Sequence, residues 1–285
     1  MFKLLDGKKL AQAITEQVAK EIIEENLEPQ LGIVLVGDNP ASHLYVKLKE
    51  QAAKVVGIVL HKYLIPESED EQKIIDAVRF LNDDPDIDAV LIQVPLPKKF
   101  DQNRILEELD YRKDVDGFHR KNVERYVSGK QQHILPGLTL AIWNLIAASG
   151  EEHYKGKKAL IIGKSANFLL PTQRFLHGQG LVVDVVRSGD PNLTQKSREA
   201  DILITAIGKP KSITAEMVKE GAVVIDIGIS TVDGKTVGDV DFKNVAPKTS
   251  YITPVPGGVG PMTIAMLLYN TLQIAKLRRK SIITS

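Results

Sequence analysis

Apolar residues recur along the chain with two different periods, and the two periods alternate. Leu10, Ile14, Val18 and Ile22 lie four positions apart, which is the spacing of an amphipathic helix. The next apolar run, at 31–37, is short and ends in glycine, which predicts a strand. The same patterns predict helices at 42–57 and 71–82, and strands at 59–65 and 88–94. Strands that alternate with helices indicate a mostly parallel sheet.

A second alternating series follows a polar, irregular stretch at 112–122 and a helical pattern at 138–149. Its strands are expected at 158–163, 181–186, 201–208 and 222–228, with helical connections between most of them. This series predicts a doubly wound sheet, so the chain is expected to form two α/β lobes. The final helical pattern, at about 261–278, is compatible with packing on either lobe.

Length and charge narrow the classes of function. The chain has 285 residues, enough for two lobes that each bury a core. Its 37 basic and 36 acidic residues nearly balance, so nothing favours nucleic acid or an anionic membrane as a partner. No apolar run approaches the roughly 18 residues of a membrane span, and Lys3 and Asp6 interrupt the N-terminal apolar stretch. We therefore expect a soluble protein that is not exported.

Cysteine and histidine usage excludes further chemistry. The chain has no cysteine, which excludes disulfides, thiolate nucleophiles and cysteine-bound metal. The histidines show no metal-ligand spacing, and we interpret all of them as structural or surface residues. They stand at positions 43, 61, 119, 133, 153 and 177. No metal site is expected.

The second lobe contains a candidate dinucleotide site. The strand at 158–163 is followed by a turn and a helix, an arrangement that binds pyrophosphate, but Gly163 is the only glycine of the turn. The next strand ends in Arg187 and Ser188 instead of the acidic residue that takes a ribose 2′-hydroxyl. A cation and a hydroxyl suit a 2′-phosphate, so NADP fits better than NAD. The alternative is a solvated arginine at the end of a strand.

The first lobe contains candidate acid/base residues. Tyr45 and Lys49 lie four positions apart on a predicted helix and share one face. Gln93 stands at the carboxyl end of a predicted strand, where α/β sheets hold ligands. Asp116 precedes a glycine in irregular chain, where its carboxylate can accept two parallel N–H bonds. Each residue alone is explained as an ordinary surface position, but together they predict an acid/base site.

Four longer motifs together resemble one family, the bifunctional methylenetetrahydrofolate dehydrogenase and methenyltetrahydrofolate cyclohydrolase proteins of the FolD type. VGDNPASHLYVKLK is similar to the family's segment around its Y-x-x-x-K pair, and LIQVPLP to its V-Q-L-P-L-P strand. KDVDGF resembles its D-V-D-G loop, and ITPVPGGVGPMT matches almost letter for letter. The resemblance extends over nearly the whole chain.

The resemblance implies both the architecture and the reactions. It implies two α/β lobes with the active site in the cleft between them. Residues 1–136, joined by a C-terminal helix at 261–280, would form the folate-binding catalytic domain, and residues 137–260 the Rossmann-like NADP-binding domain. The family oxidises 5,10-methylene-tetrahydrofolate to 5,10-methenyl-tetrahydrofolate with NADP and hydrolyses the product to 10-formyl-tetrahydrofolate. It also implies a cytoplasmic homodimer that supplies purine biosynthesis.

The resemblance assigns roles residue by residue. Lys49 matches the family's catalytic lysine, Gln93 the glutamine that tunes it, and Asp116 the residue that holds the pterin. Tyr45 matches the tyrosine that stacks on the aminobenzoyl ring. The further substrate-binding positions are Pro256, Gly257 and Gly258. Together with Arg187, the expected cofactor-binding positions are Gly163, Lys164, Ser165, Ser188, Ile229, Gly258, Val259 and Gly260.

The chain departs from the family mainly on the cofactor side. LPGLTLA keeps only Pro136 of the family's P-C-T-P-x-G core, and GKSANFLLP has Leu169 where the family has glycine. Gln51 replaces a second lysine that is frequent in the family. A branched side chain at position 169 is expected to obstruct the close approach of a dinucleotide. Lys164 and Arg187 still favour binding of a phosphate.

Three alternatives remain open at this level. The first is a cyclohydrolase-only or folate-binding homologue whose cofactor groove is closed by Phe168 and Leu169. The second is a non-catalytic interaction protein built on an inherited α/β scaffold, and the third is a two-lobe dehydrogenase for a small acid. Lys49, Gln93 and Asp116 argue against the second alternative. The third would have no use for Tyr45, Lys49 and Asp116. NAD remains the alternative cofactor.

Overall fold

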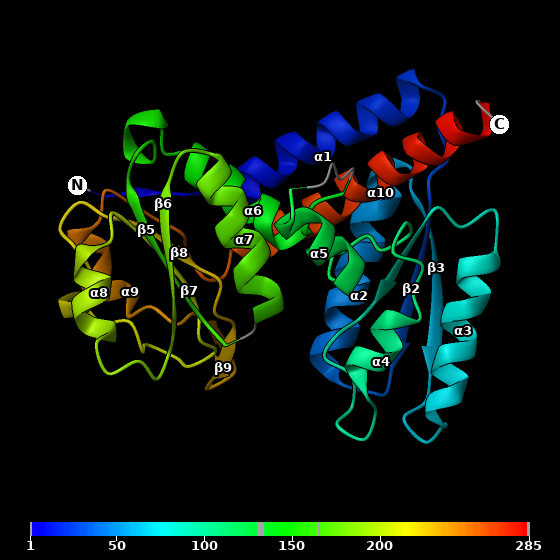
Figure 1. Ribbon diagram of the computed structural model, residues 1–285, viewed down its shortest axis with the longest axis horizontal. Coiled ribbons are helices and arrows are strands. Elements are labelled where there is room, and N and C mark those ends of the chain that lie inside the picture. Colours follow the sequence, from blue (N-terminus) through cyan, green and yellow to red (C-terminus); the bar gives the residue numbers. More distant parts are fainter. Residues whose placement is uncertain (1, 130–133, 165, 284–285) are drawn as a thin grey trace. The chain divides into compact units, whose positions relative to one another are not determined.

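The computed structural model describes residues 2–129, 134–164 and 166–283, which form two compact units (Figure 1). The three-stranded unit comprises Gln12–Gly137 and the chain from Ile264 onward. The six-stranded unit comprises the chain up to Ala11 and Leu138–Thr263. Within the described ranges, no helix has the length and apolar content needed to span a bilayer.

The three-stranded unit is built on a parallel sheet. Strand β2 (Gln30–Val36) lies between β3 (Val59–Ile65) and β4 (Ala89–Ile92). The helices that belong wholly or partly to this unit are α1 (Gly7–Glu24), α2 (Pro40–Val56), α3 (Glu71–Asp83), α4 (Gln102–Glu107), α5 (Arg120–Val127) and α10 (Val259–Ile283). The predicted alternation of strands and helices is confirmed here.

Strand β2 has an unbroken apolar sequence because both of its faces are buried. Leu31, Ile33 and Leu35 pack in one buried cluster with residues of α1, α2 and α10. Val34 and Val36 point to the other face and pack in a second cluster with residues of α3. Because helices cover both faces of the sheet, every position of β2 beyond its first residue is buried and apolar or glycine.

The six-stranded unit is built on a second parallel sheet. Its strands lie in the order β1 (Lys3–Leu4), β11 (Tyr251–Ile252), β8 (Val223–Asp226), β7 (Ile202–Ala206), β5 (Lys158–Gly163) and β6 (Val182–Arg187). All neighbouring strands are parallel. From β6 to β11 this is the doubly wound order, in which the chain reverses direction across the sheet between β5 and β7. The predicted fold class is therefore confirmed.

Short elements complete the six-stranded unit. They are α6 (Gly137–Ala147), η1 (Glu151–His153), α7 (Ala166–Gly178), α8 (Leu193–Glu199), η2 (Ala215–Met217), β9 (Ser230–Val232), β10 (Lys235–Val237), α9 (Phe242–Val245) and η3 (Ala246–Lys248). Strands β9 and β10 form an antiparallel hairpin. The helices α6 and α7 were predicted, whereas the elements of three or four residues carry too little hydrophobic periodicity to be predicted from the sequence.

One sequence prediction about the N-terminal residues is wrong. The first eleven residues were expected in the first lobe, but Lys3 and Leu4 pair with Tyr251 and Ile252 at the edge of the six-stranded sheet. The backbone N–H of Leu5 also donates to the carbonyl of Ile252, at 2.9 Å. A strand of two residues leaves no periodic pattern, so only the pairing itself reveals it.

Candidate active site

The structure joins Lys49 to Gln93. Asn39 caps α2 by accepting backbone N–H groups of Ala41 and Ser42, which fixes the start of the helix that carries Lys49. The Nζ of Lys49 donates a hydrogen bond of 2.8 Å to Oε1 of Gln93, which directly follows β4. The amide nitrogen of Gln93 donates to the carbonyl of its neighbour at 2.8 Å, so its oxygen is left to face the lysine.

The electrostatics of this site place Asp116 beside the lysine. Burial lowers the pKa of Lys49, and the negative charge of Asp116 opposes that shift. Burial raises the pKa of Asp116 to about 6, with a further contribution from Asp114, while Lys49 acts in the opposite direction. Burial also raises the pKa of Tyr45, one turn before Lys49 on α2. Lys49, Gln93 and Asp116 are thus brought together, and Tyr45 lies on the same helix face.

Asp114 shapes the loop that carries Asp116, a role that the sequence did not reveal. The side chain of Asp114 is buried, and it accepts the backbone N–H groups of Gly117 at 3.1 Å and His119 at 2.8 Å. It also accepts the side-chain amide of Asn122 at 3.0 Å. These bonds hold the turn closed, so the two aspartates of the D-V-D-G motif have different tasks.

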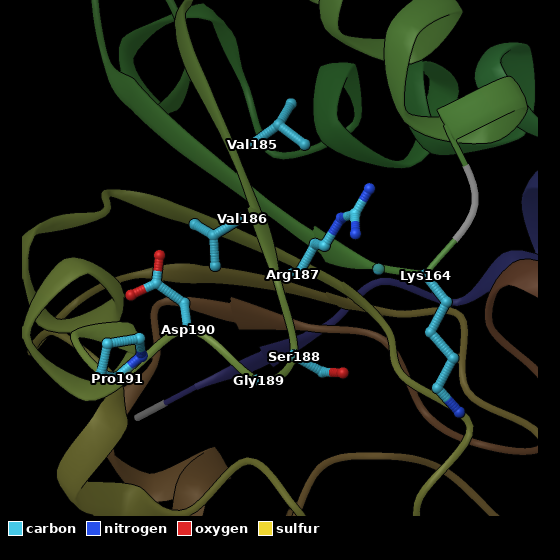
Figure 2. A pocket seen from close by; sticks show the side chains of 9 residues that line it. Lys164, Val185, Val186, Arg187, Ser188, Gly189, Asp190 and Pro191 are labelled. Atoms are coloured by element: carbon cyan, nitrogen blue, oxygen red, sulfur yellow. The ribbon is translucent and has the colours of Figure 1, made fainter.

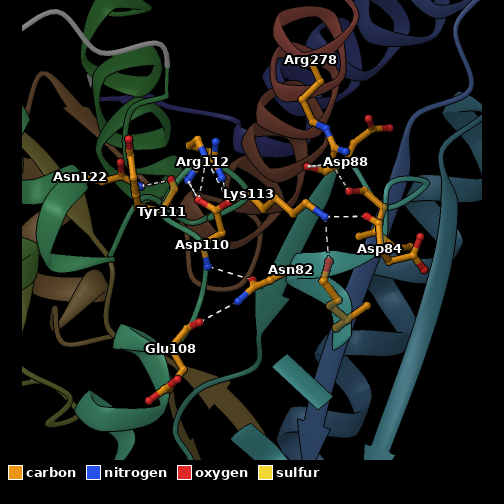
Figure 3. Close-up of polar contacts among 12 residues, drawn as sticks. Asn82, Asp84, Asp88, Glu108, Asp110, Tyr111, Arg112, Lys113, Asn122 and Arg278 are labelled. Carbon is orange, nitrogen blue, oxygen red and sulfur yellow. Dashed lines mark hydrogen bonds and ion pairs between the residues drawn. The ribbon is translucent and has the colours of Figure 1, made fainter. Parts of the chain in front are cut away.

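Lys113 anchors the same loop to the end of α3 (Figure 3). Its side chain is buried, and its Nζ donates to the carbonyl of Leu81 at 2.8 Å and to that of Asp84 at 2.7 Å. A cation at the carboxyl end of a helix satisfies carbonyls that have no partner within the helix. Burial lowers the pKa of Lys113 to about 8, and the nearby Arg278 adds to the shift.

Two asparagines hold the segment that precedes Lys113 (Figure 3). Asn82 donates to the carbonyl of Glu108 at 2.7 Å and accepts the backbone N–H of Asp110 at 2.8 Å. Asn122 donates to the carbonyl of Tyr111 at 2.8 Å. The chain leading to Asp116 is therefore held by side-chain hydrogen bonds instead of by a long strand.

Asn270 of α10 adds a buried link to this loop. Its side-chain amide donates to the carbonyls of Val115 and Leu135, both at 2.9 Å. We expect Asn270→Leu to lower the free energy of unfolding by about 2 kcal/mol or more, because two enclosed carbonyls lose their donor. Urea denaturation followed by circular dichroism measures this, with Tyr269→Leu at an exposed position of the same helix as the control. Equal midpoints for the two variants would contradict the assignment.

The proline- and glycine-rich loop before α10 needs its bare backbone for packing inside the six-stranded unit. A Cβ on Gly258 would stand 2.6 Å from the carbonyl oxygen of Pro254, and one on Gly7 would stand 1.8 Å from the carbonyl oxygen of Gly258. Gly257 has a φ of +108°, which side chains rarely tolerate. Its carbonyl accepts the backbone N–H of Lys8 at 3.2 Å. These contacts explain Gly7, Gly257 and Gly258 without reference to a ligand.

A pocket of about 580 Å³ lies at the carboxyl ends of β5 and β6 (Figure 2). Its lining consists of Gly163, Lys164, Val185, Val186, Arg187, Ser188, Gly189, Asp190 and Pro191. Four of the predicted cofactor residues, Gly163, Lys164, Arg187 and Ser188, are thus brought together. In the part of the chain that the structure describes, the side chains of Lys164 and Arg187 have no hydrogen-bond or ion-pair partner.

Of the remaining predicted cofactor positions that the structure describes, none is part of this pocket lining. Ile229 follows β8 and is 49% exposed, and Val259 and Gly260 begin α10. Ser165 and the side chain of Phe168 lie outside what the structure describes.

Asp190 is a pocket residue that sequence reasoning missed. One oxygen of its carboxylate accepts Nζ of Lys196 at 2.6 Å, and the other accepts the backbone N–H of Asn192 at 2.7 Å. The hydrogen bond from Lys196 holds the pKa of Asp190 below its usual range. The residue stands three positions beyond the end of β6, and attention to the whole loop rather than to the strand end alone would have found it.

Leu169 is buried beneath the pocket. Its side chain is 5% exposed, and its Cδ2 lies 2.9 Å from the point that a Cβ on Gly163 would occupy. The branched side chain therefore fills the interior under the backbone of Gly163 and is not part of the pocket lining.

A pair of buried aspartates organises the loops that follow β7 and β8. Asp226 accepts backbone N–H groups of Gly228, Asp239 and Val240 at 2.9, 3.1 and 2.9 Å. Asp239 accepts the backbone N–H groups of Ile207 and Lys209 at 2.6 and 2.9 Å. Burial raises the pKa of Asp226 to about 6, and the backbone N–H bonds oppose the shift. The sequence did not reveal this pair, because its partners come from separate loops.

Two family models match the chain. One, described as tetrahydrofolate dehydrogenase/cyclohydrolase, catalytic domain, matches residues 5–116. The other, described as tetrahydrofolate dehydrogenase/cyclohydrolase, NAD(P)-binding domain, matches residues 136–279. The first model covers Lys49, Gln93 and Asp116, and the second covers the pocket at β5 and β6.

Individual relatives match over almost their whole length. The bifunctional protein FolD of a Nitratiruptor species is 46% identical over 283 residues, which cover 98% of this chain and 100% of the relative. The crystal structure of the bifunctional enzyme FolD from Campylobacter jejuni is 41% identical, with a TM-score of 0.92 over 98% of this chain and 100% of the other. The FolD protein of Trypanosoma brucei, solved with NADP and an inhibitor, is 31% identical, with a TM-score of 0.91 over 99% and 98%.

Proposed function

The chain belongs to the tetrahydrofolate dehydrogenase/cyclohydrolase family, and on that premise we propose how its residues perform two consecutive reactions. The first oxidises 5,10-methylene-tetrahydrofolate to 5,10-methenyl-tetrahydrofolate by transfer of a hydride to NADP. The second adds water to the methenyl group and gives 10-formyl-tetrahydrofolate. The observation that carries the proposal is the hydrogen bond of 2.8 Å between Lys49 and Gln93 beside Asp116.

Lys49 is the proposed proton-transfer group of the hydrolysis. Its neutral amine takes a proton from the attacking water as the water oxygen bonds to the bridge carbon. The bond from this carbon to N5 then breaks, N5 receives a proton, and the formyl group stays on N10, so that one proton is released overall. Burial favours the neutral amine because it lowers the pKa of Lys49, and Gln93 holds the nitrogen in place.

Asp116 and Tyr45 are proposed to bind the folate. The carboxylate of Asp116 can accept two parallel N–H bonds from the aminopyrimidine edge of the pterin. Tyr45 offers a half-buried ring on the same helix face as Lys49, on which the aminobenzoyl ring would stack. Pro256, Gly257 and Gly258 are the further proposed substrate-binding positions.

The pocket at β5 and β6 fits a dinucleotide that carries a 2′-phosphate. It lies at the carboxyl ends of the strands, where doubly wound sheets bind ligands, and its volume of about 580 Å³ is in the range of cofactor sites. Lys164, Arg187 and Ser188 offer two cations and a hydroxyl to a phosphate. When bound, NADP supplies the hydride acceptor of the oxidation.

The other proposed cofactor positions follow from the family resemblance. They are Gly163, Ser165, Ile229, Gly258, Val259 and Gly260, and NAD remains the alternative cofactor. The family further supports the proposal of a cytoplasmic homodimer whose product serves purine biosynthesis. Light scattering of the purified protein tests the dimer.

Substrate binding is expected to weaken in acid. The pKa of Asp116 is raised to about 6 in the folded protein, so the carboxylate is ionised only above that pH. Below it the carboxyl is protonated and loses acceptor capacity, so the Kd of tetrahydrofolate should rise by up to about tenfold for each pH unit. Calorimetry under anaerobic conditions between about pH 5 and about pH 8 measures this, and Asp116→Asn should bind weakly with no such dependence. Constant affinity in the unmodified protein would contradict the assigned role.

Two absorbance assays test the proposed function. Methenyl-tetrahydrofolate should appear after methylene-tetrahydrofolate is mixed with the protein and NADP, and preformed methenyl-tetrahydrofolate should decay faster with the protein than without it. Decay without appearance under NADP or NAD would favour the cyclohydrolase-only alternative. Absence of both effects, with no appearance of methenyl-tetrahydrofolate and no faster decay, would contradict the proposal.

A further inference from the structure

The proposed cofactor pocket contains charges of both signs. Lys164 and Arg187 contribute cations, and Asp190 contributes a carboxylate, all within one pocket lining (Figure 2). In the view of Figure 2, Ser188 lies between Asp190 and Lys164. A ribose that binds over the end of β6 therefore meets a carboxylate as well as the cations.

A carboxylate in this position acts differently on the two dinucleotides. It repels a 2′-phosphate, which carries negative charge, and it can accept a hydrogen bond from a 2′-hydroxyl. The cations Lys164 and Arg187 act in the opposite direction, because they attract the phosphate. The balance between these groups decides how strongly the pocket prefers NADP to NAD.

Lys196 forms an ion pair with the carboxylate of Asp190. Its Nζ lies 2.6 Å from Oδ2 of Asp190, and the Asp190 side chain is 22% exposed against 47% for Lys196. The carboxylate is also fixed within its own loop, because the second oxygen of Asp190 accepts the N–H of Asn192 at 2.7 Å. Lys196 thus offsets part of the negative charge that a 2′-phosphate would otherwise meet.

We propose that Asp190, held by Lys196, is the specificity-determining residue of this pocket, and that it reduces the preference of the protein for NADP over NAD. The inference rests on the proposed dinucleotide function of the pocket. It means that Asp190, in the loop after β6, contributes to the discrimination between NADP and NAD. Lys164 and Arg187 contribute in the opposite direction, because they attract the 2′-phosphate.

Calorimetric binding of NADP and NAD to the purified protein tests this without any turnover. Asp190→Asn keeps a side-chain oxygen for the N–H of Asn192 but removes the charge, so the ratio of the Kd for NAD to the Kd for NADP should rise about fivefold. Lys196→Met should lower that ratio about threefold. In the double variant, Lys196→Met should have a much smaller effect on the ratio, because Asp190→Asn has already removed the carboxylate charge that Lys196 offsets.

Asp184→Asn is the matched control. Asp184 is an exposed residue of β6 that is not part of the pocket lining, so the same change of charge there should leave the ratio unchanged. Thermal unfolding of each variant verifies that it is folded. A ratio for Asp190→Asn that stays within about twofold of the unmodified value, as for Asp184→Asn, would overturn the inference. Failure of the unmodified protein to bind either dinucleotide would instead overturn the proposed function.

Discussion

Replacing Lys49 by alanine is expected to slow the hydrolysis of methenyl-tetrahydrofolate by about 10²–10⁴-fold, the range attributed to a general acid or base. The reason is that the variant has no amine to take the proton of the attacking water. Transfer of the hydride requires no proton transfer, so the dehydrogenase reaction should fall much less. The measurement is the rate of decay of preformed methenyl-tetrahydrofolate at saturating substrate, with the NADP-dependent oxidation measured in parallel.

Lys47→Ala is the control for this prediction. Lys47 is exposed on the same helix, two positions from Lys49, and its removal changes the charge of the helix without touching Gln93. Both activities should remain within about twofold of the unmodified protein, as expected for an exposed position away from the chemistry. Equal loss of both activities in Lys49→Ala would indicate a general disturbance of the site, and unchanged hydrolysis would exclude Lys49 as the proton-transfer group.

Gly238→Ala is expected to destabilise the six-stranded unit by about 3 kcal/mol. The new Cβ would stand 2.0 Å from Oδ2 of Asp226, and this carboxylate cannot move without losing backbone N–H bonds. Trp143, the single tryptophan of the chain, belongs to this unit and packs against Tyr154 and Phe175. Its fluorescence during urea denaturation therefore measures the loss.

Gly178→Ala serves as the control for Gly238→Ala. Gly178 is the last residue of α7, and a Cβ there would have nothing within 4 Å. We expect a change of no more than about 1 kcal/mol, in the direction of higher stability. If the two alanine variants denatured at the same urea concentration, the buried aspartate pair would not be the constraint that we infer.

The sequence predicted the fold because the inner strands of both sheets are buried and parallel. β2 and β5 are short apolar runs, and each is followed by the spacing of a helix. This pattern can be recognised without knowing which strands pair with each other. β1 was misplaced because two residues carry no period, and only its pairing with β11 assigns it to a sheet. The order of strands in the second sheet likewise depends on contacts between distant segments.

The candidate site was predicted less completely than the fold. Lys49, Gln93 and Asp116 were identified because a helix face, a strand end and a glycine turn suggested where they would lie. Asp114 was not, because two aspartates in one D-V-D-G motif look alike until their burial and partners are known. Asn270 was missed for a similar reason, since its partners lie more than a hundred residues away in the chain.

The most direct test of the account follows both products in one reaction. The purified protein is incubated with methylene-tetrahydrofolate and NADP, and NADPH and 10-formyl-tetrahydrofolate are quantified over time. We predict that both accumulate and finally reach equal amounts, and that Lys49→Ala yields NADPH with methenyl-tetrahydrofolate in place of the formyl product. Two results would contradict this prediction. In the first, the unmodified protein forms NADPH, but 10-formyl-tetrahydrofolate forms no faster than by hydrolysis of methenyl-tetrahydrofolate without protein. In the second, neither product forms.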